Sequence, residues 1–419
     1  MAQTNQITFE GRGWRLFWLA LSRMCLTIVT LGLARFWMIT RLRRYYWSSV
    51  TIAGTPLEYT GRAGEKFIGF LIAVVILALY LAAVNLLLTF VGLAFFQGNP
   101  AALNLSILAA VPLGFWAQYR ARRYILARTR WRGIRFGATS AAWGYTATAM
   151  WWWTVTIISL GLLYPWMQLA LSRYVTNRSW FGDAQFSQAG RLWPLMRAWL
   201  WVWVPVIALS LGVMTTFEDT AALINSVENN LEAPSSTDEW GGAGLVWLPI
   251  GVFAVIGALY LRYQVIAFRY LNSQKTVGAA GFGFELPFWT VFRIYVVGYI
   301  LVIIVLTAVA MALFGAAFLY AYAIGADMSG FEAMTEGQLP VAGAMVTAII
   351  FAALYLFLIA LYTALRHTWI TRPLARAVVA STTILNIAAL NDVRQRAHDE
   401  QAEAGGFADA LGADPGAAF

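Results

Sequence analysis

Three long windows of the chain, residues 67–119, 198–261 and 294–365, are mostly apolar and contain neither lysine nor arginine. A helix needs about 20 apolar residues to cross the roughly 30 Å hydrocarbon layer of a membrane, so each window can hold two such helices. The pattern predicts three helical hairpins, with helices at about 67–96 and 101–119, 198–216 and 244–264, and 289–324 and 340–365. Because membranes retain basic residues on the cytoplasmic side, we expect each hairpin to leave the cytoplasm and return.

Two further apolar segments, residues 14–40 and 143–171, have basic residues on both sides. Spanning segments there would place arginine-rich stretches on opposite faces of the membrane, against the usual bias. Each segment also contains a break, Thr30-Leu31-Gly32-Leu33 in the first and Ser159-Leu160-Gly161-Leu162 in the second. We therefore favour helix–break–helix segments that re-enter or lie at the interface; the alternative is two ordinary spans. The predicted fold class is an all-α polytopic membrane protein with about six to eight transmembrane helices and both termini cytoplasmic.

Composition supports a membrane protein. The chain has 419 residues, of which 60% are hydrophobic and 12% charged, and this balance excludes a soluble globular protein. The net charge of +9 comes from basic residues beside apolar segments, so anionic lipid headgroups rather than nucleic acid are the expected partners. Residues 1–390 are predicted to form one integral membrane domain, and the polar residues 391–419 a disordered cytoplasmic tail. An oligomer is compatible with all of these features.

The strongest motif is an internal repeat of aromatic and basic residues. Seven residues of the first copy recur 79 positions later, so that Phe36, Trp37, Arg41, Arg43, Arg44, Tyr45 and Gly54 correspond to Phe115, Trp116, Arg120, Arg122, Arg123, Tyr124 and Gly133. A third copy, 129 positions after the first, includes Trp166, Arg173 and Tyr174, and a fainter fourth contains Arg269-Tyr270. A fifth, around residues 366–372, is too degraded to count. The repeat predicts a duplicated unit in which an apolar helix ends in a basic turn, here called the Arg-Tyr elbow.

These residues carry a family resemblance. Phe9-Glu10-Gly11-Arg12-Gly13, the run from Leu26 to Leu33 before Phe36-Trp37, and the recurrent elbows resemble the YjgN family of bacterial inner-membrane proteins, a family of unknown function. The resemblance covers about residues 9–390. The chain departs from the family at Ala34-Arg35, where a tyrosine and a small residue usually precede Pro-Trp, although Tyr164-Pro165-Trp166 keeps that form. The resemblance implies an inner-membrane location and an architecture, and it implies no reaction.

The sequence contains no constellation typical of an enzyme. Cys25 is alone, and the two histidines, His367 and His398, do not form a cluster with metal-ligand spacing. Within the three apolar windows, the predicted helices contain no Asp, Glu, His, Lys or Arg. We therefore expect no catalytic residue, no metal and no cofactor.

The elbows provide the candidate site residues. Candidate contacts for lipid headgroups or other anions are Arg41, Arg43, Arg44, Tyr45, Arg120, Arg122, Arg123, Tyr124, Arg173, Tyr174, Arg269 and Tyr270. Arg23 and Arg35 are candidate intramembrane cations. The working hypothesis is passage or handling of a small solute or lipid without catalysis, and the alternative is a scaffold or anionic-lipid-binding protein without transport. A further alternative is that the elbows bind no specific ligand and only fix the orientation of the helices in the membrane.

Overall fold

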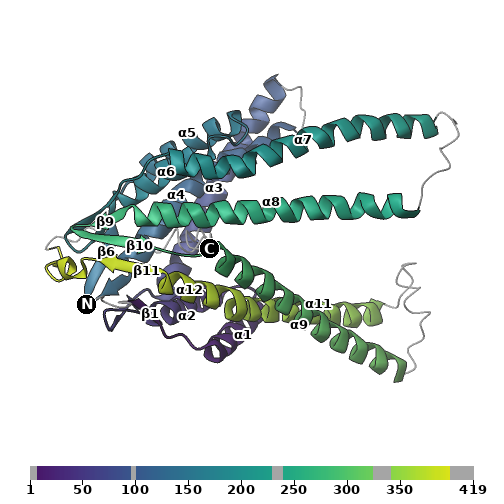
Figure 1. Ribbon diagram of the computed structural model, residues 1–419. Helices are drawn as coiled ribbons and strands as arrows, with labels where there is room; N and C mark the ends of the chain where they lie inside the picture. The colour runs from purple at the N-terminus through teal and green to yellow at the C-terminus, as the bar shows by residue number, and fades with distance from the viewer. Residues whose placement is uncertain (1–6, 96–100, 229–238, 324–340, 397–419) are drawn as a thin grey trace.

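The computed structural model describes residues 7–95, 101–228, 239–323 and 341–396, and it shows the three expected helical hairpins. Their helices are α3 (Ala63–Phe95) with α4 (Ala101–Ala127), α7 (Trp193–Glu228) with α8 (Glu239–Ser273), and α9 (Phe288–Ala323) with α11 (Val341–Arg366). The pairs project from one end of the molecule, and α7–α8 diverges from α9–α11 (Figure 1). The three connecting loops expected at the far ends fall on or beside the gaps between the described ranges.

Five helical stretches in the described part of the chain are long and apolar enough to cross a membrane: Ala63–Phe90, Trp193–Ser210, Gly251–Ser273, Phe288–Ala316 and Ala352–Ala380. Between 11% and 28% of each is buried inside the protein, so most of their apolar surface faces outward. Such surface needs lipid around it. The sixth expected span is the helix α4, which is not among these five.

The two glycine-interrupted segments form helix–break–helix units, as predicted. They are α1 (Gly13–Val29) with α2 (Arg35–Ser48), and α5 (Ala142–Ile158) with α6 (Tyr164–Thr176). Gly32 and Gly161 have φ values of 93° and 82°, a conformation that favours glycine, and each N–H closes the preceding helix. At 17 residues, α1 and α5 are about 25 Å long, which is shorter than the hydrocarbon layer.

The structure also contains a curled antiparallel sheet at the end from which the helices project, so the prediction of an all-α fold is wrong in this respect (Figure 1). Its strands are β1 (Ile7–Phe9), β2 (Val50–Ile52), β3 (Thr55–Pro56), β4 (Glu58–Tyr59), β5 (Thr129–Trp131), β6 (Ile134–Ala138), β7 (Ser179–Phe181), β8 (Ala184–Gln188), β9 (Lys275–Val277), β10 (Ala280–Phe284) and β11 (Thr382–Leu385). Strands β4 to β11 pair in chain order, and β1, β2 and β3 form a smaller sheet. The unit α1–α2 joins β1 and β2 of the smaller sheet, and α5–α6 joins β6 and β7 of the larger one, so both ends of each unit lie at the sheet end of the molecule.

The strands exist because each elbow is followed by a β-hairpin. Ala53-Gly54 and Arg132-Gly133 have positive φ at both positions, which is the type I′ geometry that matches the twist of two-residue hairpins. Among the described residues no strand is longer than five residues, and a single hairpin of this length is not stable alone. Successive hairpins therefore pair with one another, as Phe136 of β6 does with Phe181 of β7.

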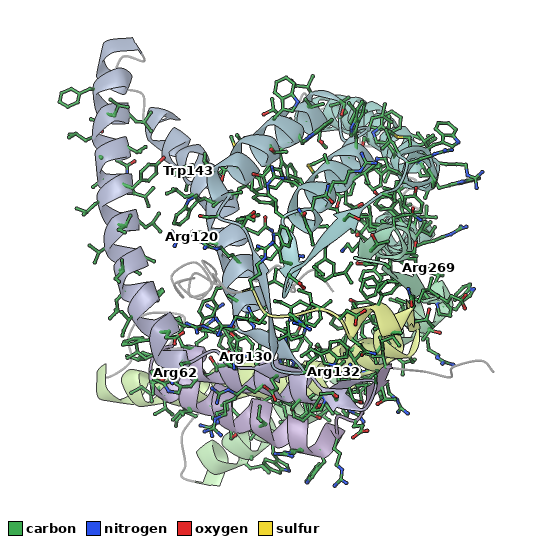
Figure 2. The ribbon with its side chains drawn as sticks, turned by 90° about the vertical axis from the view of Figure 1, so that its left-hand side faces the viewer. Arg62, Arg120, Arg130, Arg132, Trp143 and Arg269 are labelled. Atoms are coloured by element: carbon green, nitrogen blue, oxygen red, sulfur yellow. The ribbon has the colours of Figure 1, made fainter. Side chains whose placement is uncertain are left out.

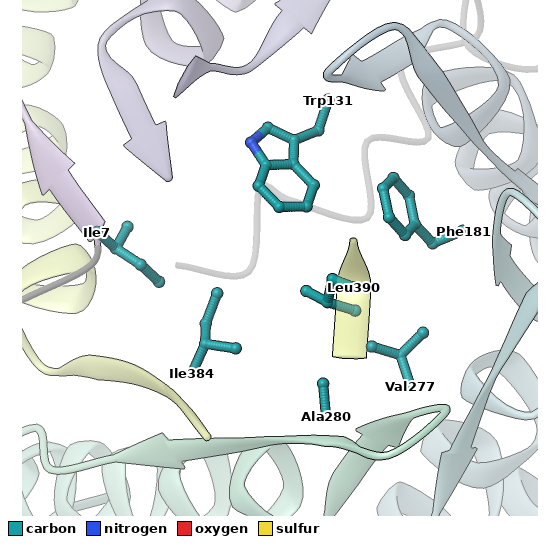
Figure 3. Close-up of a cluster of buried hydrophobic side chains, with 7 residues drawn as sticks. All are labelled: Ile7, Trp131, Phe181, Val277, Ala280, Ile384 and Leu390. Carbon is teal, nitrogen blue, oxygen red and sulfur yellow. The ribbon is translucent and has the colours of Figure 1, made fainter. Parts of the chain in front are cut away.

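A buried hydrophobic cluster fills the inside of the curled sheet (Figure 3). Its members come from β1, β5, β7, β9, β10, β11 and the C-terminal segment: Ile7, Trp131, Phe181, Val277, Ala280, Ile384 and Leu390. Trp131 and Phe181 are each 2% exposed, and their ring centroids lie 5.6 Å apart. This core holds together the ends of helical hairpins that otherwise diverge.

The C-terminal part of the chain completes the sheet. After α11 a π-helical turn, His367–Thr371, leads into α12 (Arg372–Ala380), β11 and a 3-10 turn (Ile387–Leu390). Residues 391–396, which the sequence assigned to the tail, run beside the β7–β8 turn: Asp183 N donates to Arg394 O (2.9 Å), and Arg394 N donates to Asp183 Oδ1 (3.1 Å). Residues 397–419 of the expected tail lie outside the described residues.

Candidate anion-binding cavities

The repeat has five copies in the structure. Each copy places an arginine six positions before a strand: Arg44 before β2, Arg123 before β5, Arg173 before β7, Arg269 before β9 and Arg376 before β11. The fifth copy is thus aligned on Arg376, beyond the residues 366–372 where the sequence pattern suggested it. In this alignment Trp369 corresponds to Trp37, Trp116 and Trp166.

Part of each elbow holds the junction between sheet and helix. Arg44 Nη2 donates to Gly61 O (2.9 Å), and the equivalent Arg173 Nη2 donates to Gly190 O. Tyr45 OH donates to Arg12 O (2.7 Å), and the equivalent Tyr174 OH donates to Ala141 O (3.0 Å). These repeated bonds satisfy carbonyl groups at the starts of helices, and they give the four side chains a structural role. A lipid contact by any of them stays a prediction.

Two further elbow tyrosines also make internal bonds. Tyr124 OH donates to Glu65 Oε2 (3.2 Å), and the same carboxylate pairs with Arg128 (2.9 Å). Tyr270 OH accepts the backbone N–H of Arg191 (2.6 Å). Both tyrosines therefore contribute to packing at the sheet rather than to an exposed basic surface.

The remaining predicted residues are distributed over separate parts of the molecule. Arg43 is buried and donates to Tyr59 OH (3.4 Å), whereas Arg35, Arg41 and Arg269 are exposed. Figure 2 shows Arg269 on the side of the molecule opposite Arg120. Arg23 and Arg35 lie on α1 and α2, on either side of the Gly32 break. The structure does not gather the predicted cations into one site.

Four tryptophans mark where the chain passes from sheet to helix. Trp14, Trp143, Trp193 and Trp289 each lie within the first two residues of a helix that follows a strand. Their side chains are between 66% and 73% exposed. Tryptophan concentrates at the boundary between hydrocarbon and headgroups, so these four residues, the tryptophan belt, indicate the membrane interface on the sheet side.

A cavity at this level, the apolar cavity, has a volume of about 600 Å³. It lies among the starts of α1, α9 and α12 and the end of α11, and its lining residues are Gly13, Trp14, Phe17, Arg293, Ile294, Val297, Gly298, Leu301, Leu365, Thr368, Trp369, Arg372 and Pro373. Most of the wall is hydrophobic. Arg293 and Arg372 supply its two positive charges, and Arg372 Nε donates to Gly11 O (2.8 Å). The cavity thus combines an apolar wall with two cations at the tryptophan belt.

Two other cavities repeat this combination. A cavity of about 270 Å³ between α7 and α8 contains Arg197 and Arg262 beside Trp201. A cavity of about 350 Å³ between α4 and α5 contains Arg120 and Arg123 beside Trp116 and Trp143. In the second cavity the guanidinium of Arg120 lies 4.7 Å from the centre of the Trp116 ring, and Figure 2 shows Arg120 next to Trp143.

The electrostatics of the cavities favour anions. Burial, together with the charge of Arg123, lowers the pKa of Arg120 from its usual value. None of the carboxylates whose side chains the structure describes lines any of these three cavities. A basic site of this kind attracts phosphate, because guanidinium groups match its geometry.

Sequence reasoning identified some of these cations and missed others. Arg120 and Arg123 were predicted from the repeat, and their cavity is formed with the start of α5. The paired cations Arg293 with Arg372, and Arg197 with Arg262, were not selected. Arg197 and Arg293 are the fifth and sixth residues of helices that follow strands, a position that has meaning only once the hairpins are in place.

Comparison with known proteins agrees with the resemblance drawn from the motifs. A model described as "Bacterial protein of unknown function (DUF898)" matches residues 4–410. The inner membrane protein YjgN of Salmonella typhimurium is 24% identical over 147 residues, which are 34% of this chain and 34% of that protein. YjgN of Escherichia coli O157:H7 is 27% identical over 151 residues, covering 36% of this chain and 34% of that protein.

The matched part therefore spans about a third of the length of these curated relatives. No solved structure matches the chain. The family match covers nearly the whole sequence, and the resemblance to YjgN is confirmed. The relatives that the chain matches are inner-membrane proteins, and the chain belongs to the DUF898 family of bacterial proteins.

Proposed function

We propose that this protein binds anionic phospholipids at the cytoplasmic leaflet of the inner membrane, without catalysis. The observation that carries the proposal is the apolar cavity, in which Arg293 and Arg372 lie at one level with Trp14 and Trp369. An acyl chain fits the hydrophobic wall, and a headgroup phosphate fits the two guanidinium groups. The cavities between α4 and α5 and between α7 and α8 support the same function, because each adds paired arginines beside a tryptophan.

The cytoplasmic leaflet is part of this proposal. The sheet end carries the elbows and their arginines, and arginine and lysine are retained on the cytoplasmic side. Anionic headgroups near a membrane surface attract each cation by about 1 kcal/mol. The other half of the working hypothesis, passage of a solute, has no comparable support. At most 28% of each candidate span in the described part of the chain is buried inside the protein, so most of the surface of these spans faces outward and not toward a shared interior.

Replacing Arg293 by glutamine should lower the affinity for phosphatidylglycerol about fivefold, the factor that about 1 kcal/mol represents. Arg293 is exposed, so its loss should leave the fold intact. The measurement is native mass spectrometry of the purified protein titrated with phosphatidylglycerol and with phosphatidylcholine. Arg269→Gln is the matched control, because Arg269 is also exposed and lines none of the three cavities.

A second variant separates the charge from the apolar wall. Val297→Trp fills the apolar cavity and should weaken binding of both lipids, whereas Arg293→Gln should weaken binding of phosphatidylglycerol alone. Equal phosphatidylglycerol binding by the wild type, Arg293→Gln and Val297→Trp would refute the assignment of lipid to this cavity.

A further inference from the structure

Two cations from different repeats meet in a small polar cavity behind the sheet. Arg122 lies near the end of α4, and Lys275 is the first residue of β9. With residues of α5 and α6 they line a space of about 190 Å³. This volume is below the roughly 300 Å³ at which ordinary ligand pockets begin, so the cavity suits a small ion better than a phospholipid.

The uncharged groups around this cavity already have hydrogen-bond partners. Ser172 Oγ (2.7 Å) and Thr176 Oγ1 (2.9 Å) both donate to Gln188 Oε1. Tyr145 OH donates to the side-chain oxygen of Gln118 (3.0 Å). The hydroxyl groups of Ser172, Thr176 and Tyr145 thus already donate hydrogen bonds within the protein.

The two cations retain donors that the protein does not use. Lys275 Nζ donates one of its three hydrogens to Asn272 Oδ1 (2.8 Å). Arg122 Nε is buried and has no hydrogen-bond partner among the described residues. A buried N–H without an acceptor is costly, and the side chain that carries it lines the cavity, where an oxyanion would balance its charge.

Charge in the cavity is unbalanced. No carboxylate in the described ranges lines it, and its titratable groups are Arg122 and Tyr119 on α4, Tyr145 on α5 and Lys275 on β9. Burial, followed by the charge of Arg122, lowers the pKa of Lys275 to about 8. Burial also lowers the pKa of Arg122. Both shifts mean that the protein alone disfavours two positive charges here.

We propose that the cavity between Arg122 and Lys275 binds a small tetrahedral oxyanion, of which a phosphoryl group is the type. The anion accepts from the guanidinium and from the ammonium, and it balances their charges. Because α4 belongs to the first helical hairpin and β9 follows the second, the bound anion joins two repeats. This site uses neither Arg293 nor the apolar cavity, so its test does not depend on whether lipid binds in the apolar cavity.

The test is thermal denaturation of delipidated, detergent-purified protein with inorganic phosphate, against chloride at equal ionic strength. At pH 7.5, about 10 mM phosphate should raise the Tm of the wild type by about 2 °C or more, since a ligand stabilises the state that binds it. Lys275→Met and Arg122→Gln should abolish the increase. Arg269→Gln should respond as the wild type does.

Two additional measurements keep the result clear if a variant is poorly stable. Without phosphate, Lys275→Met should have a Tm at or above that of the wild type, because it removes one of two repelling charges. With sulfate, whose charge is constant over this range, the increase in wild-type Tm should shrink between pH 7 and pH 9.5 as Lys275 loses its proton.

Phosphatidylglycerol added in place of phosphate distinguishes the sources of the phosphoryl group. A Lys275-dependent increase with free phosphate assigns the site to a soluble anion, and an increase with the lipid alone assigns it to a headgroup. An increase of equal size in Lys275→Met and the wild type, or none with either probe, would overturn the proposal.

Discussion

Replacing Phe181 by alanine should lower the free energy of unfolding by about 3–5 kcal/mol, the usual cost of removing a buried phenylalanine from a packed core. Phe181 is 2% exposed and its ring contacts Trp131 and Phe136, with centroid distances of 5.6 and 4.7 Å. The cavity left behind would lie in the centre of the curled sheet. Samples are heated to a series of temperatures and the remaining folded protein is measured by size-exclusion chromatography. The loss of stability appears as a lower Tm.

The control is the same substitution on a surface that faces outward. Phe253 lies in the candidate span Gly251–Ser273 and is 70% exposed, so Phe253→Ala should change the Tm little. If the two variants lost equal stability, the sheet core would not be what holds the hairpins together.

Gly182→Ala should destabilise the protein by about 2–5 kcal/mol, through backbone strain of about 1–2 kcal/mol and overpacking of about 1–3 kcal/mol. Gly182 has a φ of 55°, and a Cβ there would lie 2.4 Å from Arg394 O and 2.9 Å from Val393 Cγ1. The added methyl group therefore displaces the segment 391–396. Limited proteolysis should then cut this segment faster than in the wild type.

Gly278→Ala separates the two contributions. Gly278 has the same φ of 55°, but nothing lies within 4 Å of a Cβ built there. It should show only the strain of about 1–2 kcal/mol, with segment 391–396 as protected as before. Equal effects of the two substitutions would mean that residues 391–396 do not pack against the β7–β8 turn.

The helices could be predicted from the sequence because long apolar runs without charge have few alternatives to a helix in a membrane. The breaks at Gly32 and Gly161 were also readable, since a glycine flanked by leucines interrupts two otherwise similar apolar runs. The bias of arginines around residues 14–40 and 143–171 favoured helix pairs that return to their starting side, and in the structure both ends of each pair join strands. Local pattern and charge were sufficient for these features.

The sheet could not be predicted in the same way. Each strand is two to five residues long, and it is stable only by pairing with a hairpin of another repeat. The available signal was local: β-branched residues around Ala53-Gly54, and Ile134 and Phe136 alternating after Arg132-Gly133. It was read as a polar turn, because the apolar helices dominate every window large enough to show periodicity.

The residues of the candidate site also divide into those that the sequence indicated and those that only the structure brings together. The repeat places Arg44 and Tyr45 in register with Arg173 and Tyr174, and the structure gives these two pairs equivalent internal hydrogen bonds at the sheet, which the repeat alone did not predict. Arg293 and Arg372 lie far apart in the sequence and meet only through packing of α9 against the π-helical turn and α12. Such a pair has no signature in the sequence.

The central claim is that the sheet end, with its elbows and cavities, faces the cytoplasm. The direct measurement is labelling of single cysteines by a membrane-impermeant reagent in intact cells, after the lone Cys25 is replaced by serine. Positions 55, 130, 183 and 275 should be protected until the inner membrane is opened, and positions 100, 230 and 332 should be labelled from outside. Labelling of position 130 or 183 in intact cells would contradict the account.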